Sequence, residues 1–217
     1  MKVEFIDNSA SQYDENADRI KVPFKSKSKM GKLFLGDSSS ASFLQLKSRS
    51  CKNVVNCSRE MHGFARETDV NYLKIDPDDE NVNIFEDSYV FIDSFREKGK
   101  NVLVHCENGI NKSAAIVLYY LMKKCDMSLG ESYKFLKSQR KKEIKIRPQI
   151  LQQLIAAEKR IRGTISIVLD GRKVVFLDNL KRSTKAGNSI SPFYILIGIA
   201  VFFAAVFLGI YLLTGKV

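Results

Sequence analysis

The sequence predicts an α/β domain with a central, mostly parallel sheet flanked by helices, followed by a C-terminal transmembrane helix. Three observations support this prediction. Short apolar segments typical of strands alternate with longer amphipathic segments typical of helices. One of these strands leads through a polar turn that contains Cys106 into an apolar helix. Near the end of the chain, residues 193–213 contain no charged side chain.

The composition is that of a globular protein with a strong positive charge. The 217 residues are 45% hydrophobic and 27% charged, which suits one domain with appendages. A net charge of +11 favours anionic partners, such as phosphorylated chains or acidic lipid surfaces. No nucleic-acid-binding motif accompanies the charge, so a nucleic-acid partner is not expected. The four cysteines lack paired metal spacing, and we expect neither a metal nor another cofactor.

The order of the predicted elements defines the domain organisation. Strands are expected at residues 32–36, 52–58, 70–75 and 101–105, and helices at 37–50, 84–99, 113–125, 128–142 and 147–163. The pair Asp170-Gly171 predicts a tight turn between two short strands, which dock on the domain or pair with a sheet edge. We therefore expect a polar N-terminal segment (1–27), the α/β domain (28–163), a β-hairpin (164–178), a basic linker (179–192) and a membrane span (193–213).

The segment from Phe193 to Leu213 has the length of a membrane span. A helix of 21 residues, at about 1.5 Å per residue, crosses a hydrocarbon core of roughly 30 Å. More basic residues precede the span than follow it, which predicts a cytosolic N-terminal domain. We expect a single-pass tail anchor in the endoplasmic reticulum or the outer mitochondrial membrane. The basic linker is interpreted as a solvated face and topology signal, with a specific contact to anionic lipid as the alternative.

The turn around Cys106 has the residues that nucleophilic attack on a phosphoester requires. A cysteine at a helix N-terminus, among inward-pointing backbone N–H groups, is favoured as the thiolate. The same N–H groups can bind phosphate oxygens. Gly109 suits the sharp turn, Ser113 can donate a hydrogen bond to the sulfur, and His105 can hold the loop through its ring nitrogens. The alternative is an ordinary buried thiol after a strand.

The segment VLVHCENGINKSAAIVLYYLM resembles the signature of the dual-specificity branch of the cysteine-dependent protein phosphatases. That signature reads His, Cys, two residues, Gly, two residues, Arg, then Ser or Thr, and the similarity extends over residues 32–162. The resemblance implies that Cys106 is the nucleophile, Ser113 the assisting hydroxyl and Asp79 the general acid, with Asp78 as the neighbour to test. It also implies a phosphate-binding loop of Glu107, Asn108, Gly109, Ile110, Asn111 and Lys112.

Lys112 departs from this signature. The family has an arginine here, whose planar fork binds two phosphate oxygens, whereas lysine offers a point charge. We therefore expect weak or absent turnover. Three functions stay open: a membrane-anchored pseudophosphatase that binds phosphorylated protein or lipid, an active phosphatase whose substrate suits Lys112, and an adaptor that works independently of the pocket.

Overall fold

The structure is a computed structural model that describes residues 17–23, 30–59, 69–76, 84–171 and 173–178. The expected membrane span, the basic linker and the two candidate acids, Asp78 and Asp79, lie outside these residues. Within the described part of the chain, no helix is both long and apolar enough to cross a bilayer.

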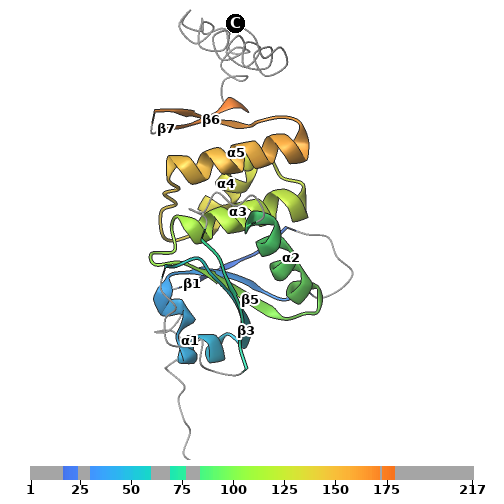
Figure 1. Cartoon of the computed structure of the whole chain (residues 1–217), viewed down its shortest axis with the longest axis vertical. Helices are drawn as coiled ribbons and strands as arrows, with labels where there is room; N and C mark the ends of the chain where they lie inside the picture. Colours follow the sequence, from blue (N-terminus) through green and yellow to red (C-terminus); the bar gives the residue numbers. More distant parts are fainter. Residues whose placement is uncertain (1–16, 24–29, 60–68, 77–83, 172, 179–217) are drawn as a thin grey trace, which may run out of the picture. The chain divides into compact units, whose positions relative to one another are not determined.

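The core of the domain is a five-stranded sheet in the order β1-β2-β5-β3-β4 (Figure 1). Four strands run parallel: β2 (Leu33–Gly36), β3 (Cys51–Asn56), β4 (Asn71–Lys74) and β5 (Asn101–His105). The central strand β5 is almost completely buried, as the apolar run in its sequence predicts. The predicted fold class, a mostly parallel sheet flanked by helices, is confirmed.

The fifth strand, β1 (Ala17–Ile20), was not predicted. It pairs antiparallel with β2 and places Ala17 and Ile20 in the core. The expected polar segment of residues 1–27 therefore contains an edge strand of the sheet. Its four residues include only two apolar side chains, so pairing with β2 rather than local propensity determines its conformation.

Helices cover both faces of the sheet (Figure 1). Helix α3 (Lys112–Cys125) packs on β5 and β2 and is flanked by α2 (Ile84–Glu97), α4 (Leu129–Gln139) and α5 (Pro148–Arg162). The expected helix after Asp37 is divided into a 3₁₀ turn, η1 (Ser38–Ala41), and a short α1 (Phe43–Ser48), both in contact with the strands.

The helix ends follow the local sequence signals. Pro148 occupies the first turn of α5, and Gly163 ends this helix in the left-handed conformation with φ +70°. Ser128 and Glu131 form a reciprocal capping box at the start of α4. These residues end the helices close to the predicted boundaries because their preferences act within a few residues.

The predicted hairpin is present as β6 (Ile167–Asp170) and β7 (Lys173–Phe176), joined at Asp170-Gly171. It forms its own two-stranded sheet, and β6 packs against α5 rather than adding to an edge of the main sheet. The fully buried Glu158 on α5 joins the start of α4 to the residue before β6. Its carboxylate accepts hydrogen bonds from Leu129 N–H at 2.7 Å and from Ser166 N–H and Oγ at 2.9 and 2.6 Å. Of the two expected placements, the contacts of β6 with α5 agree with docking on the domain.

Candidate active site

A loop of six residues joins the end of β5 at His105 to the start of α3 at Lys112. Because β2, β3 and β5 are parallel, their carboxyl ends meet at one edge of the sheet, and the loop lies there. Gly109 adopts φ +71°, and a Cβ at this position would lie 2.8 Å from the carbonyl group of Gly36. The glycine is therefore required both by its backbone conformation and by its close approach to β2.

The loop brings the predicted nucleophile and its hydroxyl partner together. Cys106 Sγ lies 3.0 Å from Ser113 Oγ, and the N–H of Gly109 points to the sulfur at 3.3 Å. Both side chains are buried, with Cys106 only 2% exposed. The sulfur and the hydroxyl can each donate in their contact. When the sulfur is a thiolate, Ser113 Oγ and the N–H of Gly109 both donate to it, which stabilises the thiolate as a nucleophile or as a leaving group in a second chemical step.

His105 is buried beneath the loop, where its main-chain oxygen accepts a hydrogen bond from Cys57 N–H at 2.8 Å. This bond ties the end of β5 to the end of β3 just before the nucleophile. The proposed role of the imidazole nitrogens stays a prediction. Burial raises the pKa of the neighbouring Cys57 well above its ordinary value, so this second thiol is protonated at neutral pH.

Glu107 turns its carboxylate toward the loop that follows β3. Its Oε1 accepts the N–H of Arg59 at 2.8 Å. Burial acts to raise the pKa of Glu107, but hydrogen bonds from the N–H groups of Arg59 and of Glu107 itself, together with the charge of Lys112, lower it overall. The carboxylate is thus ionised at neutral pH and engaged by the protein backbone.

Lys112, the residue that departs from the signature, is 6% exposed at the first position of α3. Its ammonium group forms an ion pair with Asp76 Oδ1 at 2.8 Å, where Asp76 has a side-chain exposure of 36%. Asp76 was not predicted as a site residue, whereas Asp78 and Asp79, which follow it, were. The run of acidic residues after β4 was the signal that could have identified it.

The cleft above Cys106 has a volume of about 360 Å³. Besides the loop residues Glu107, Asn108, Asn111 and Lys112, its described lining includes two arginines that sequence reasoning did not select, Arg59 and Arg147. A third arginine, Arg140, is buried behind the loop, where it donates to Leu35 O at 3.0 Å and lies near Asp18. Burial lowers the pKa of Arg140, while the nearby charges of Asp18 and Cys106 act in the opposite direction. The site is therefore richer in cations than its signature suggests.

Not every predicted site residue can be placed. Of the predicted residues, the cleft is lined by Cys106, Glu107, Asn108, Asn111 and Lys112. Ser113 is buried next to the Cys106 sulfur, and His105 is buried at the end of β5. Asp79 and Asp78 lie outside the described residues, so the general acid stays a prediction. Within the described ranges, no cluster of three or more histidine, cysteine or carboxylate side chains is arranged to bind a metal ion.

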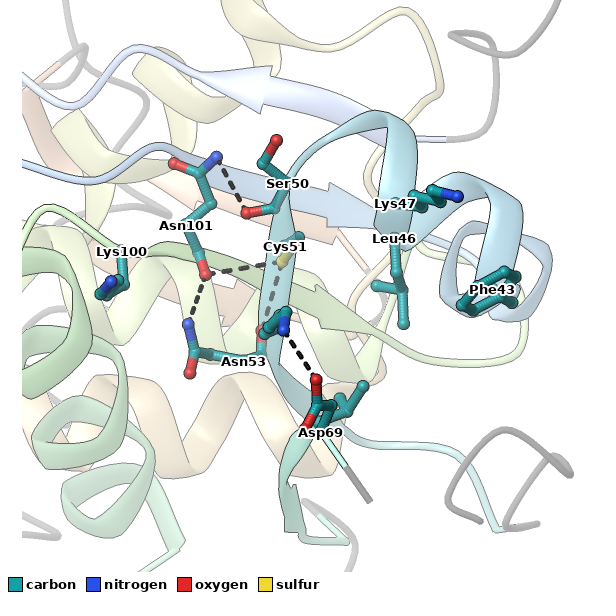
Figure 2. Close-up of a pocket in the computed structure, with 11 residues that line it drawn as sticks. Phe43, Leu46, Lys47, Ser50, Cys51, Asn53, Asp69, Lys100 and Asn101 are labelled. Atoms are coloured by element: carbon teal, nitrogen blue, oxygen red, sulfur yellow. Dashed lines mark hydrogen bonds and ion pairs between the residues drawn. The ribbon is translucent and has the colours of Figure 1, made fainter. Parts of the chain in front are cut away.

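A second cavity, larger than the cleft above Cys106, does not coincide with the reactive loop. It has a volume of about 520 Å³ and lies at the amino ends of β3 and β5, around Cys51, Asn53 and Asn101 (Figure 2). The Cys51 thiol points at Asn101 O from 3.5 Å, and burial raises its pKa to about 11. Because a thiol with this pKa is protonated at neutral pH, and the described lining of this cavity includes no residue of the loop 106–111, the candidate phosphate site is the smaller cleft at Cys106.

Comparison with known proteins agrees with this site. The family model of the dual specificity phosphatase catalytic domain matches residues 33–160. The protein phosphatase Slingshot homolog of Xenopus laevis is 32% identical over 142 residues, which make up 63% of this chain and 20% of that protein. The protein-tyrosine-phosphatase IBR5 of Arabidopsis thaliana is 34% identical over 114 residues, which make up 52% of this chain and 39% of that protein. The chain therefore spans well under half the length of these relatives.

Two solved human structures have the same fold. The structure of DUSP28 is similar with a TM-score of 0.54 and 27% identity, covering 60% of this chain and 90% of that one. The structure of the tyrosine phosphatase-like serine/threonine/tyrosine-interacting protein is similar with a TM-score of 0.53 and 26% identity, covering 59% and 92%. Since the family model matches more than half of the sequence and the loop geometry agrees with it, the chain belongs to the dual-specificity phosphatase family of cysteine-dependent phosphatases.

Proposed function

We propose that this protein is a membrane-anchored, dual-specificity phosphatase-like protein that binds phosphorylated protein or lipid and turns it over weakly or not at all. The observation that carries this proposal is Lys112 in an otherwise complete phosphate loop. Its ammonium group is buried and already paired with Asp76 at 2.8 Å. The loop thus keeps its shape for binding but lacks the clamp for the transition state.

Lysine and arginine differ in the number of directed hydrogen bonds that they can donate to a phosphoryl group. An arginine fork donates two parallel hydrogen bonds to a phosphoryl group, whereas lysine supplies one point charge. Loss of one preorganised donor to a developing oxyanion costs on the order of 3–4 kcal/mol, or roughly 10²- to 10³-fold in rate. In addition, Asp76 competes with a bound phosphate for Lys112. Loss of the fork weakens catalysis more than binding, whereas the competition from Asp76 weakens both.

One similar protein supports a binding role. The human structure that is 26% identical is described as a tyrosine phosphatase-like, serine/threonine/tyrosine-interacting protein. Its name describes a phosphatase-like protein that interacts with other molecules. This similarity supports, for the present chain, a role in which recognition matters more than turnover.

An active phosphatase is the second candidate, and a separate observation favours it. Cys106 and Ser113 keep their contact of 3.0 Å, and the N–H of Gly109 still points at the sulfur. A loop used only for binding would not need the Ser113 hydroxyl next to the thiol. In this alternative, Lys112 binds the phosphate of an unusual phosphoprotein or phospholipid substrate.

The membrane anchor is part of the same proposal. Its support is the uncharged segment of 21 residues from Phe193 to Leu213 and the basic residues that precede it. The expected topology has the phosphatase-like domain in the cytosol, at the endoplasmic reticulum or the outer mitochondrial membrane. Anchoring would concentrate the cleft at a membrane surface where phosphorylated partners gather.

The test compares binding and turnover in the full-length protein. Equilibrium binding of orthovanadate, which occupies phosphate sites, is measured together with the hydrolysis of an aryl phosphate. We expect binding with little hydrolysis in the parent protein and a large gain in hydrolysis in Lys112→Arg. Hydrolysis by the parent as fast as by this variant would favour the active phosphatase. Partner binding that is unchanged by Cys106→Ser and by added orthovanadate would favour an adaptor that does not use the pocket.

A further inference from the structure

The cleft contains two guanidinium groups that do not belong to the phosphate loop. Arg59 follows β3 and Arg147 precedes α5, and both line the cleft of about 360 Å³ together with Cys106 and Lys112. Glu107 is the acidic residue of the described lining, and its carboxylate is engaged by a backbone N–H. The described lining therefore has a net positive charge beyond what Lys112 supplies.

Two hydrogen bonds from backbone N–H groups join the segment that contains Arg147 to the end of the loop nearest α3. Its own N–H donates to Asn111 Oδ1 at 2.9 Å, and the N–H of Lys145, two residues earlier, donates to Ile110 O at 3.0 Å. Pro148 follows directly and begins α5. These contacts fix the backbone position of Arg147 at the side of the cleft.

The backbone of Arg59 is hydrogen-bonded to the start of the same loop, next to β5. Its N–H donates to Glu107 Oε1 at 2.8 Å, one residue after the nucleophile. The preceding turn is closed by Asn56, whose Oδ1 accepts hydrogen bonds from Ser58 N–H at 2.8 Å and Ser58 Oγ at 2.6 Å. The two arginines thus emerge from segments that are hydrogen-bonded to opposite ends of one phosphate loop.

We propose that Arg59 and Arg147 form a second anion subsite beside the loop, so that the cleft binds a polyol bisphosphate, either free or as a lipid headgroup. This inference rests on the proposed function, in which the loop binds the first phosphate. The planar guanidinium fork suits the oxygens of a phosphate monoester, so the two arginines would bind the second phosphate. Lys112 and the loop N–H groups would bind the first phosphate.

The size of the cleft favours a compact ligand over a doubly phosphorylated peptide. A volume of about 360 Å³ lies at the small end of the ~300–1,000 Å³ typical of small-ligand sites. In an extended peptide, neighbouring side chains point to opposite faces, and the next one on the same face is about 6.6 Å away. Two phosphates on neighbouring carbons of one ring can enter together.

The experiment measures equilibrium binding by calorimetry in full-length protein that carries Cys106→Ser to prevent turnover. The probes are inorganic phosphate, inositol 1-phosphate and inositol 4,5-bisphosphate. We expect the bisphosphate to bind at least ~10-fold more tightly than the monophosphate, since its second phosphate gains charge-assisted hydrogen bonds from the two guanidinium groups. Arg59→Gln and Arg147→Gln should each weaken the binding of the bisphosphate more than the binding of inorganic phosphate, so that each variant loses most of this preference. Lys145→Gln is the matched control, because Lys145 lies two residues from Arg147 with a side chain that is 66% exposed and paired with Glu143.

The outcomes separate this inference from the proposed function. If the protein binds no inorganic phosphate, the proposed function fails. If it binds phosphate without preferring the bisphosphate, or if Arg147→Gln weakens phosphate and bisphosphate equally, the second subsite is refuted alone. Tighter binding of a peptide with two neighbouring phosphorylated residues would also refute it. Phosphatidylcholine vesicles with and without the matching bisphosphorylated inositol lipid identify the source, because the proposed anchor acts equally on both kinds of vesicle. A gain from the lipid that exceeds the affinity for the soluble headgroup indicates a lipid, and the reverse indicates a free polyol phosphate.

Discussion

Lys112 and Asp76 form an ion pair of 2.8 Å across the mouth of the phosphate loop, although 36 residues separate them in the sequence. The lysine is buried, and the aspartate is partly exposed two residues after β4. The cation at the end of the candidate anion-binding loop is thus already paired with the carboxylate of Asp76. Any phosphate that enters must share Lys112 with Asp76 or displace it.

Asp76→Asn should strengthen the binding of inorganic phosphate. Removal of one negative charge close to the anion site is worth roughly 1 kcal/mol at a partly exposed position, or about fivefold in affinity. Calorimetric titration with phosphate measures the change. The matched control is Asp69→Asn, which breaks the exposed pair with Lys52 at the opposite end of the strands and should leave phosphate affinity unchanged. Weaker phosphate binding in Asp76→Asn would mean that the aspartate positions Lys112 for binding.

Lys112→Arg should raise kcat/KM for an aryl phosphate by roughly 10²-fold, because the guanidinium restores a bidentate contact to the transferring phosphoryl group. Steady-state kinetics provide the measurement, and a further gain is expected when Asp76→Asn is added. Cys106→Ser in the arginine background is the control: it should abolish turnover but retain phosphate binding. A parent protein that is already as fast as the variant would contradict the pseudophosphatase proposal.

Asp79→Asn should slow the hydrolysis of esters with poor leaving groups more than that of esters with good ones. A general acid matters most when the departing oxygen is basic. The experiment is best done in the Lys112→Arg background, where turnover is measurable, with a series of aryl phosphates of graded leaving-group pKa. Equal slowing across the series would remove Asp79 from this role and direct the same experiment to Asp78.

The carboxylate of Asp37 should make stability depend on pH at the acid end. Burial acts to raise the pKa of Asp37, but hydrogen bonds from Lys142 at 2.6 Å and from Ser39 at 2.6 Å outweigh it and lower the pKa overall. A lowered folded-state pKa gives stability that is complete above the unfolded value of about 3.9 and is lost as the pH falls through the folded value. Asp37→Asn should lower the free energy of unfolding by about 1 kcal/mol at neutral pH, and this difference should shrink below about pH 4. Urea denaturation at several pH values measures it; a difference that is constant with pH would exclude the carboxylate as the cause.

Full-length protein should fractionate with membranes and resist extraction with alkaline carbonate. Deletion of residues 193–217 should release it into the soluble fraction, because this segment contains the expected membrane span. Replacing the apolar segment by another apolar sequence of equal length is the control and should preserve membrane association. Recovery of the full-length chain in the soluble fraction would refute the anchor.

The sequence alone was sufficient to predict those features of the structure that depend on neighbouring residues. The strand before Cys106, the need for glycine at position 109, the start of α5 at Pro148 and its end at Gly163 all depend on preferences that act over a few residues. The contact between Cys106 and Ser113 was predictable for the same reason, since one short loop joins them. The resemblance to the phosphatase family added the roles of these residues to a geometry that the local pattern already implied.

Only the tertiary structure showed which distant residues complete the site. Asp76 reaches Lys112, and Arg59 and Arg147 meet in one cleft, because parallel strands end at the same edge of the sheet and α5 begins beside the loop. Strand β1 belongs to the sheet through its pairing with β2 rather than through its composition. Such contacts depend on how elements pack, and packing selects among many partners that are equally compatible with local sequence. The sequence therefore determined the reactive loop, whereas the fold determined the charges that surround it.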